Sequence, residues 1–304
     1  MKYALLALIW VGFLLSARAE VRTWTSTDGR TIEAEFVKGD ETSVTIKRGT
    51  KQFSLPLDKI TDADREYVKN RVAEAKKLDV SELGDYAKYA KAEWVKGELN
   101  GLKFQIYAPD AYERDEPIPL VVFLHGVGER GNDNEKQLNR LPKTFASPGN
   151  QAKRPCIVAA PQCPSKKYWS YDDVSGQVID LAKTLAKNMP IDENRLYIGG
   201  YSMGGYGTWA ALGKDPKTFA AAVPIAGGGN PSIAKSIKNI PIWNFHGDAD
   251  KSVKVTESRK MVEALKKAKA KITYTEMKGA GHGIAGKVLK DEKVHEWLFS
   301  QKKD

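Results

Sequence analysis

The sequence predicts an α/β protein in which a mainly parallel sheet carries helices on both faces, preceded by a small all-β domain. From residue 96 to the C-terminus, apolar runs of strand length alternate with helical patterns, which is typical of a parallel sheet. Residues 20–72 instead hold short alternating runs separated by Gly and Asp turn signals, which indicate antiparallel hairpins. A chain of 304 residues is long enough for two such domains.

The first 19 residues have the pattern of a signal peptide. A short basic start is followed by the apolar run Tyr3–Leu15 and by Ala17-Arg18-Ala19, which has the small-x-small form of a cleavage site. The apolar run is shorter than the roughly 20 residues that a membrane-spanning helix needs. We therefore expect cleavage after Ala19 and export, periplasmic or extracellular, without a stable membrane span. A retained anchor helix is the alternative.

Residues 20–72 are expected to form a small β-barrel. The four expected strands cover 21–26, 31–37, 43–47 and 52–57, each with one apolar face. Closure into a barrel is favoured because an open sheet would expose its edges. A helix starts at Thr61–Asp64, and its apolar stripe is Tyr67, Val68 and Val72. Trp24 is expected in the core rather than as a ligand-stacking residue.

Two segments of this domain resemble a known family. Arg22–Ile32 (RTWTSTDGRTI) and Leu57–Asp64 (LDKITDAD) are similar to the Sla-one homology domain, first type. The resemblance implies an SH3-like barrel and a peptide or protein ligand. Residues 73–95 are rich in Ala and Lys and are expected to form a helical linker.

Residues 96–304 are expected to form the larger α/β domain. Residues 96–108 are predicted to add antiparallel strands at the sheet edge, and Asp172 is predicted to be the N-cap of a helix. The expected main strands are 118–124, 156–160, 195–200, 220–226, 241–246 and 271–277. The expected helices lie near 134–146, 172–188, 203–213, 254–268 and 290–300.

The most informative motif is Gly200-Tyr-Ser-Met-Gly204, which follows an apolar strand and precedes a helix of small residues. This arrangement is typical of a nucleophile elbow, a tight strand-to-helix turn that exposes a serine hydroxyl. Gly200 and Gly204 suit the turn because side chains there would collide. Ser202 is therefore the candidate nucleophile.

A nucleophilic serine needs a base, and the base needs a carboxylate. Asp250 follows the strand 241–246, and His282 follows the strand 271–277 between two glycines. Both residues are expected at the carboxyl edge of the sheet, where open α/β sheets assemble their sites. Asp248 is the alternative acid, although it could instead cap the loop. His125, His246 and His295 are expected to be structural.

The strand 118–124 runs into a glycine-rich loop, Gly126–Gly131, which can supply an oxyanion-hole amide. Met203, directly after the nucleophile, supplies the other amide. Glu129 and Arg130 are expected to order this loop as an ion pair, with substrate contact as the alternative. Trp169 is a candidate substrate-binding residue that would line the acyl or sugar pocket, and core packing is equally compatible with the sequence.

Residues 95–300 resemble α/β-hydrolases of the branch that includes carbohydrate esterases, feruloyl esterases and predicted peptidases. The resemblance implies that Asp250 is the triad acid and that the amide of Val127 joins that of Met203 in the oxyanion hole. The matching motifs are LHGVGERGNDN at 124–134, APQCP at 160–164, GYSMGG at 200–205, HGDAD at 246–250 and GHG at 281–283.

These features predict an exported serine hydrolase that cleaves carboxylic esters, including acetyl or feruloyl esters of polysaccharides, with no metal or organic cofactor. A serine peptidase of the prolyl-oligopeptidase type is the first alternative, although no upstream repeats could build a gating propeller. An interaction protein with a degenerate catalytic half is the second, and an intact set of Ser202, Asp250 and His282 counts against it.

The chain carries a formal charge of +10 from lysines and arginines scattered over the predicted helices. This pattern favours solvated helix faces over nucleic-acid binding, and it is compatible with a mild attraction to acidic polysaccharide or to an anionic surface. The two cysteines, Cys156 and Cys163, flank a predicted strand and are too far apart for a disulfide if the chain between them is extended.

Overall fold

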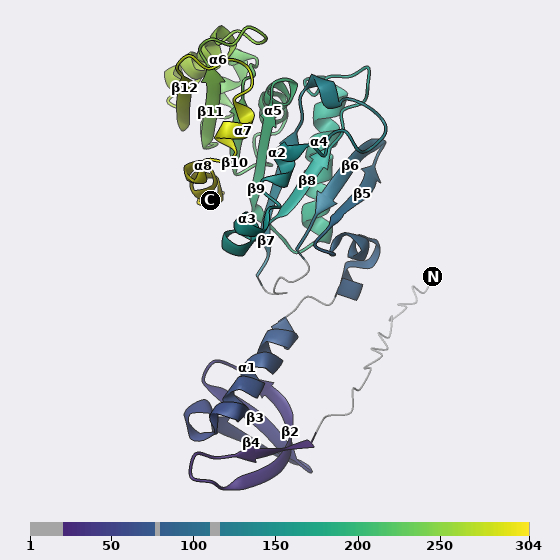
Figure 1. The fold of residues 1–304 in the computed structure, drawn as a ribbon, viewed down its shortest axis with the longest axis vertical. Coiled ribbons are helices and arrows are strands. Elements are labelled where there is room, and N and C mark those ends of the chain that lie inside the picture. Colours follow the sequence, from purple (N-terminus) through teal and green to yellow (C-terminus); the bar gives the residue numbers. More distant parts are fainter. Residues whose placement is uncertain (1–20, 77–79, 110–115, 304) are drawn as a thin grey trace, which may run out of the picture. The chain divides into compact units, whose positions relative to one another are not determined.

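The computed structural model describes residues 21–76, 80–109 and 116–303, which form two compact units (Figure 1). The division between the units falls between positions 77 and 78 of the sequence, inside the predicted linker. The predicted signal peptide lies outside the described residues. None of the helices in the described ranges is long and apolar enough to cross a membrane.

The N-terminal unit is a four-stranded antiparallel sheet with a helix beside it. The strands follow one another in the order β1-β2-β3-β4. Their bounds are Val21–Thr25, Thr31–Gly39, Ser43–Arg48 and Lys51–Pro56, followed by η1 (Leu57–Lys59) and α1 (Asp62–Lys76). The four strands agree with the predicted ranges.

The predicted closure into a barrel is not seen in residues 21–76. The sheet order leaves β1 and β4 at opposite edges, and the two strands do not pair with each other. A single antiparallel bridge joins Ser26, directly after β1, to Ile60, directly after η1. Helix α1 contributes buried Val68 and partly buried Tyr67 and Val72 to the core of the sheet. The helix therefore covers the apolar face that we expected a barrel to enclose.

Trp24 lies in the core of this unit, as expected. Its side chain is 1% exposed and its indole Nε1 donates to the carbonyl of Ala34 over 3.0 Å. The guanidinium of Arg22 lies 3.7 Å from the centre of the Tyr67 ring. Phe53 is 40% exposed and contributes less to the core than its strand pattern predicted.

The larger unit is built on an eight-stranded sheet with the order β12-β11-β10-β9-β7-β8-β6-β5. Strands β7 to β12 are parallel to one another, and β5 and β6 extend the sheet as an antiparallel edge, as predicted. The strands are β5 Trp94–Leu99, β6 Leu102–Tyr107, β7 Ile118–Leu124, β8 Ile157–Pro161, β9 Ile191–Tyr201, β10 Ala221–Ile225, β11 Ile242–Gly247 and β12 Ile272–Met277.

Four of the five helices expected in this unit are present. They are α4 (Asp172–Asn188), α5 (Met203–Lys214), α6 (Thr256–Lys267) and α8 (Glu292–Phe299). Short helices add to them: η3 Val127–Glu129, α2 Arg140–Lys143, α3 Pro148–Lys153, η4 Pro231–Lys235 and α7 Ala285–Val288.

The single long helix predicted over 134–146 is wrong. Asn134 has a positive φ of 55°, and its backbone amide donates to Gln162 Oε1 over 2.7 Å, so the chain there is a loop tied to the end of β8. The helical residues are limited to α2. The N-cap of α4 is Tyr171 rather than Asp172, which is the first helical residue.

The predicted helical linker over 73–95 is only partly helical. α1 continues to Lys76, and η2 (Val80–Tyr89) is a 3₁₀ segment of the larger unit. Tyr89 is buried, and its ring centre lies 5.9 Å from that of Phe104 on β6. The end of the linker thus packs as part of the larger unit.

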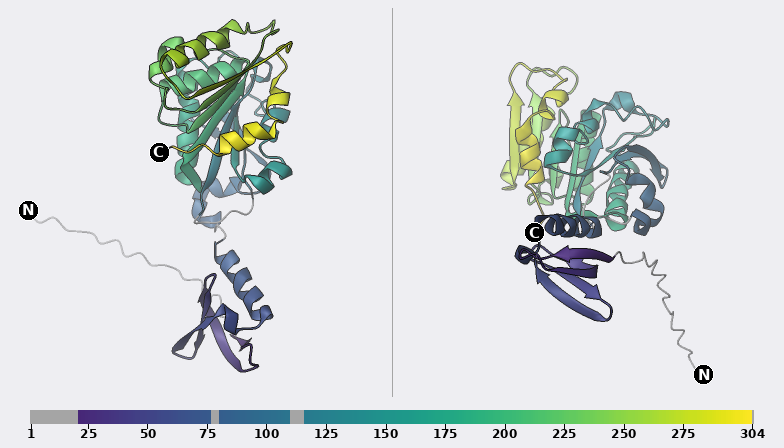
Figure 2. Two further views of the ribbon diagram at one scale, coloured as in Figure 1. Left: turned by 90° about the vertical axis from the view of Figure 1, so that its left-hand side faces the viewer. Right: turned by 60° about the horizontal axis from the view of Figure 1, so that its bottom comes forward.

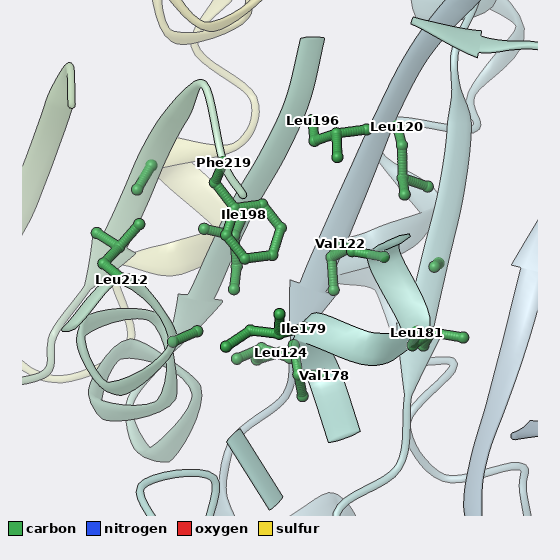
Figure 3. Close-up of a cluster of buried hydrophobic side chains, with 14 of the residues drawn as sticks. Leu120, Val122, Leu124, Val178, Ile179, Leu181, Leu196, Ile198, Leu212 and Phe219 are labelled. Carbon is green, nitrogen blue, oxygen red and sulfur yellow. The ribbon is translucent and has the colours of Figure 1, made fainter. Parts of the chain in front are cut away.

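Alternating side chains of β7 point into two separate cores. Leu120, Val122 and Leu124 pack with residues of α4 and α5 such as Val178 and Leu212 (Figure 3). Val121 and Phe123 pack on the other face with residues of α2, α7 and α8. Helices α4 and α5 therefore cover one face and α2, α7 and α8 the other, and the left view of Figure 2 shows the yellow α8 in front of the sheet. Burial on both faces explains why β7 is apolar throughout.

Candidate active site

Ser202 stands on a sharp turn between β9 and α5. Its φ of 58° and ψ of −115° are strained for a residue with a side chain, and its amide donates to the carbonyl of Ile225 over 2.9 Å. A Cβ on Gly200 would collide with the backbone of Gly204, and a Cβ on Gly204 would collide with the carbonyl of Leu124. The two glycines are therefore required by the turn, as the sequence predicted.

Three residues distant in the sequence meet at the carboxyl edge of the sheet. The Oγ atom of Ser202 lies 2.8 Å from His282 Nε2, and His282 Nδ1 lies 2.6 Å from Asp250 Oδ2. Ser202 follows β9, Asp250 follows β11, and His282 follows β12. The structure thus brings together the three residues that the sequence nominated, in one chain of hydrogen bonds.

The Asp250 carboxylate is held by donors on both oxygens. Burial alone raises the pKa of Asp250, but hydrogen bonds from His282 and from the amides of Val253 and Ser252 outweigh it and hold the pKa below its usual value. The group is therefore ionised at neutral pH and accepts a hydrogen bond from the protonated His282 Nδ1, which leaves His282 Nε2 free to accept the Ser202 hydroxyl proton.

Asp248 does not contact the imidazole of His282 in the described residues. Its Oδ1 instead accepts the amide of Gly279 over 2.6 Å, which ties the two loops after β11 and β12 together. The choice of Asp250 over Asp248 as the acid partner of His282 therefore agrees with the geometry.

Sequence reasoning missed a second imidazole beside Asp250. His246 Nε2 lies 3.3 Å from Asp250 Oδ2 and 2.9 Å from the carbonyl of Val253, while His246 Nδ1 lies 2.7 Å from Ser258 Oγ. Both neighbours of Nε2 are acceptors, so Nε2 carries a proton and donates toward them. The His246-Gly-Asp-Ala-Asp250 spacing, which places the imidazole four residues before the acid, was the available signal.

The predicted oxyanion amides begin two short helices. Val127 is the first residue of η3 and Met203 is the first residue of α5, so neither amide has an acceptor within its own helix. The Val127 side chain is 49% exposed, whereas Met203 is buried.

The loop that carries Val127 is braced by His125. His125 Nε2 accepts the amide of Cys163 over 3.0 Å, and Nδ1 donates to the carbonyl of Gly126 over 2.5 Å. Burial lowers the pKa of His125 to about 4, so the ring is neutral at neutral pH. The expectation of a structural role for His125 agrees with these contacts.

Glu129 and Arg130 do not form the predicted ion pair with each other. Glu129 Oε1 accepts the Asn139 side-chain amide over 3.1 Å, and Arg130 donates to the carbonyls of Val127 and Lys167. Glu129 therefore ties the loop 126–131, which carries Val127, to Asn139, and Arg130 ties it to Lys167. Both side chains still order this loop, which we call the oxyanion loop.

The prediction that Trp169 lines a substrate pocket is wrong. The side chain is fully buried, and its indole Nε1 donates to the carbonyl of His125 over 3.0 Å. It packs directly against Gly207 of α5, where a Cβ would strike it. Trp169 therefore supports the base of the oxyanion loop from inside the core.

The two cysteines are free thiols, both buried. Burial raises the pKa of each to about 12, which leaves them protonated and unreactive. In the described part of the chain, no group of three or more His, Cys, Asp or Glu side chains is placed to hold a metal ion.

Comparisons with known proteins agree with this architecture. A crystal structure of a thermostable esterase is 31% identical, with a TM-score of 0.66, and the match covers 92% of this chain and 70% of that one. The propionate-bound esterase Est2 of the planctomycete Thermogutta terrifontis is 19% identical, with a TM-score of 0.53, over 68% of this chain and 93% of that one. The second likeness shows the fold alone.

The bifunctional acetylxylan esterase/xylanase XynS20E of Neocallimastix patriciarum is 28% identical over 158 residues, or 49% of this chain. The match spans only 22% of the length of that protein. Residues 99–296 match the model of the dienelactone hydrolase family, which covers most of the larger unit. With an α/β-hydrolase sheet, a strained serine turn and this match, the chain belongs to the dienelactone hydrolase family.

Proposed function

We propose that this protein hydrolyses carboxylic esters through an acyl-serine intermediate, with Ser202 as nucleophile, His282 as base and Asp250 as its partner. The observation that carries the proposal is the continuous chain from Ser202 Oγ through His282 to the buried carboxylate of Asp250, with steps of 2.8 and 2.6 Å. Serine hydrolases on unrelated folds share this arrangement of groups.

Acylation begins when Ser202 Oγ attacks the ester carbonyl carbon and its proton moves to His282 Nε2. The resulting imidazolium is stabilised by Asp250, and the oxyanion is received by the amides of Met203 and Val127. The intermediate then collapses: the carbon–oxygen bond to the alcohol breaks, and the alcohol leaves with the proton from His282.

Deacylation repeats the same steps with water. His282 removes a proton from water, the hydroxide attacks the acyl carbon, and the second tetrahedral intermediate releases a carboxylic acid as Ser202 regains its proton. The chain supplies every proton acceptor and donor in this cycle, so the proposed reaction runs without a cofactor.

We further propose esters of polysaccharides, such as acetyl or feruloyl esters, as the substrates. The likeness to a stretch of a bifunctional acetylxylan esterase/xylanase and to a thermostable esterase supports this class. Export after cleavage near Ala19 would place the enzyme beside such polymers, and N-terminal sequencing of the secreted protein tests it by starting at Glu20. A peptide or protein ligand remains our proposal for the N-terminal unit.

The test compares the mature chain with Ser202→Ala on nitrophenyl acetate, butyrate and ferulate. We expect ester turnover in the parent and a loss of at least about 10⁴-fold in the variant, because no other group replaces the nucleophile. Ser232→Ala, on the short helix η4, is the matched control and should keep full activity. Full activity in Ser202→Ala would refute the mechanism, and peptide cleavage without ester turnover would favour a serine peptidase.

A further inference from the structure

A groove of about 620 Å³ begins one residue from the proposed catalytic imidazole. Its volume lies in the range of small-ligand sites. Gly283, which directly follows His282, forms one part of its wall. The other lining residues come from α2, α7 and the segments that follow them: Arg140, Leu141, Thr144, Gly286, Lys287, Lys290 and Asp291.

The groove gathers three cations from two parts of the sequence. Arg140, Lys287 and Lys290 are all exposed, and within the described residues none of their side-chain nitrogens has a hydrogen-bond or ion-pair partner. The guanidinium of Arg140 lies over α7, 3.8 Å from where a Cβ on Gly286 would be. α2 and α7 therefore hold cations from two parts of the chain along the same groove.

One lining carboxylate accompanies these cations. Asp291 Oδ1 already accepts the amide of Lys293 over 3.0 Å as the N-cap of α8. The neighbouring Glu292 is paired with Lys153 and Arg154 and does not line the groove. Three cations therefore face one carboxylate in the lining, and the groove keeps a net positive charge beside the site.

Unpaired cations around an open groove favour an anionic ligand, because they have no internal partner to satisfy them. Three separate exposed cations, on α2, on α7 and on the turn after α7, suit a chain with spaced single charges. A phosphate site would instead gather backbone amides or bidentate arginines on one group. Carboxylates spaced along a polymer meet this requirement.

We propose that this groove binds carboxylate-bearing sugar residues of an acidic polysaccharide while an ester on the same chain reacts at Ser202. The inference rests on the proposed function, which it narrows to esters carried by uronate-containing polymers. Binding there would hold the polymer beside His282 and would add to substrate capture without taking part in the chemistry.

The first experiment compares acetylated glucuronoxylan with the same polymer after carboxyl reduction and re-acetylation to an equal degree. We expect the parent protein to prefer the carboxylated polymer in kcat/KM by about 3- to 10-fold, since exposed charge pairs each contribute a factor of a few. The preference should disappear in 1 M NaCl, where the screening length falls to about 3 Å.

The matched variants are Arg140→Gln/Lys287→Gln in the groove and Lys187→Gln/Lys266→Gln on exposed faces of α4 and α6. Both pairs remove two positive charges from the protein. The groove pair should lower the preference ratio to about one, whereas the control pair should keep it. A parent without preference, or a groove pair that keeps the preference, would overturn the inference.

A binding measurement separates this inference from the proposed function. Ser202→Ala protein should bind deacetylated glucuronoxylan more tightly than neutral xylan in affinity electrophoresis, and the groove pair added to it should remove the difference. If the Ser202→Ala protein shows this binding but the parent protein turns over no ester, the proposed function is refuted and the polysaccharide site in the groove stands. Equal binding of both polymers, or tighter binding to phosphatidylglycerol vesicles than to either polymer, would reject the polysaccharide site.

Discussion

His246 shows how a residue outside the predicted triad can affect the proposed catalysis. Its ring is fully buried between Ser258 and Asp250, and its Nε2 proton is directed at two oxygen acceptors. It is therefore a positioning residue that orients the carboxylate, while His282 exchanges protons with the substrate. The charged groups that face it are Asp250 and, on the neighbouring strand β12, Glu276, which is paired with Arg259.

We predict that His246→Phe lowers kcat/KM for nitrophenyl acetate by about tenfold or more. A hydrogen bond to a charged group contributes about 1.5–3 kcal/mol, and the aromatic ring cannot supply it. His246→Gln keeps an amide N–H that can reach Asp250 and should recover much of the loss. An equal loss in both variants together with equally reduced melting temperatures would assign His246 a purely structural role.

Because His125 is buried, we predict that the free energy of unfolding depends on pH. Its pKa is about 4 in the folded chain, because burial disfavours the charged ring, against 6.5 for a free histidine. Between these values the unfolded chain binds more protons, so the free energy of unfolding rises with pH from about 4 to 6.5 and is fully present above 6.5. The contribution is at most about 3 kcal/mol.

Denaturant unfolding of the parent and of His125→Gln across pH 4 to 7 measures this slope. The glutamine can still accept the Cys163 amide but does not titrate, so its slope should be smaller. Some slope should remain, because burial also lowers the pKa of His295. Identical slopes in the two proteins would show that His125 is not the group that titrates.

At the scale of elements, the β9–α5 turn depends on close backbone approach. Gly204→Ala would place a methyl group against the carbonyl of Leu124, and a rigid strand cannot move aside for it. We predict a loss of about 1–3 kcal/mol in the free energy of unfolding. We also predict that kcat falls even where the variant is fully folded, because the clash displaces Ser202 directly.

Gly149→Ala on α3 is the control, since its Cβ meets no atom within 4 Å and its backbone is helical. That variant should be as stable as the parent or slightly more stable. Unchanged activity in Gly204→Ala, measured on nitrophenyl acetate, would mean that the turn adapts and that the glycine is not required for the geometry of Ser202.

At the scale of the whole molecule, each unit has its own core. The sheet of the small unit packs around Trp24, Val44 and Ile46, and both cores of the larger unit are made from residues after 78. The residues of the proposed triad, the oxyanion amides and the groove also belong to the larger unit. Separate cores are the condition for independent folding.

We predict that residues 78–304 produced alone hydrolyse nitrophenyl acetate with kcat/KM within about twofold of the mature chain, because no residue of the site is lost. Calorimetry of the mature chain should resolve two transitions, one of which is absent from the shortened protein. Aggregation or inactivity of the shortened protein, beside an active mature chain, would show that the small unit is needed for folding of the larger one.

The sequence by itself determined the features that depend on neighbouring residues. The runs 118–124 and 241–246 are strands because continuous apolar sequence is buried on both sheet faces, and Gly200 and Gly204 mark a turn that only glycine can form. The carboxyl ends of parallel strands share one edge, so a meeting of Ser202, His282 and an acid after the strand 241–246 could be predicted, whereas the structure separates Asp250 from Asp248.

Only the tertiary structure decided which side chains are covered and which distant groups converge. Packing against α5 placed Trp169 inside the core, and α1 covered the small sheet that we expected to close on itself. It also turned the His246 imidazole toward the Asp250 carboxylate and brought Arg140 into one groove with Lys287. These outcomes depend on how side chains and whole elements pack in three dimensions, and local patterns of polarity do not encode that packing.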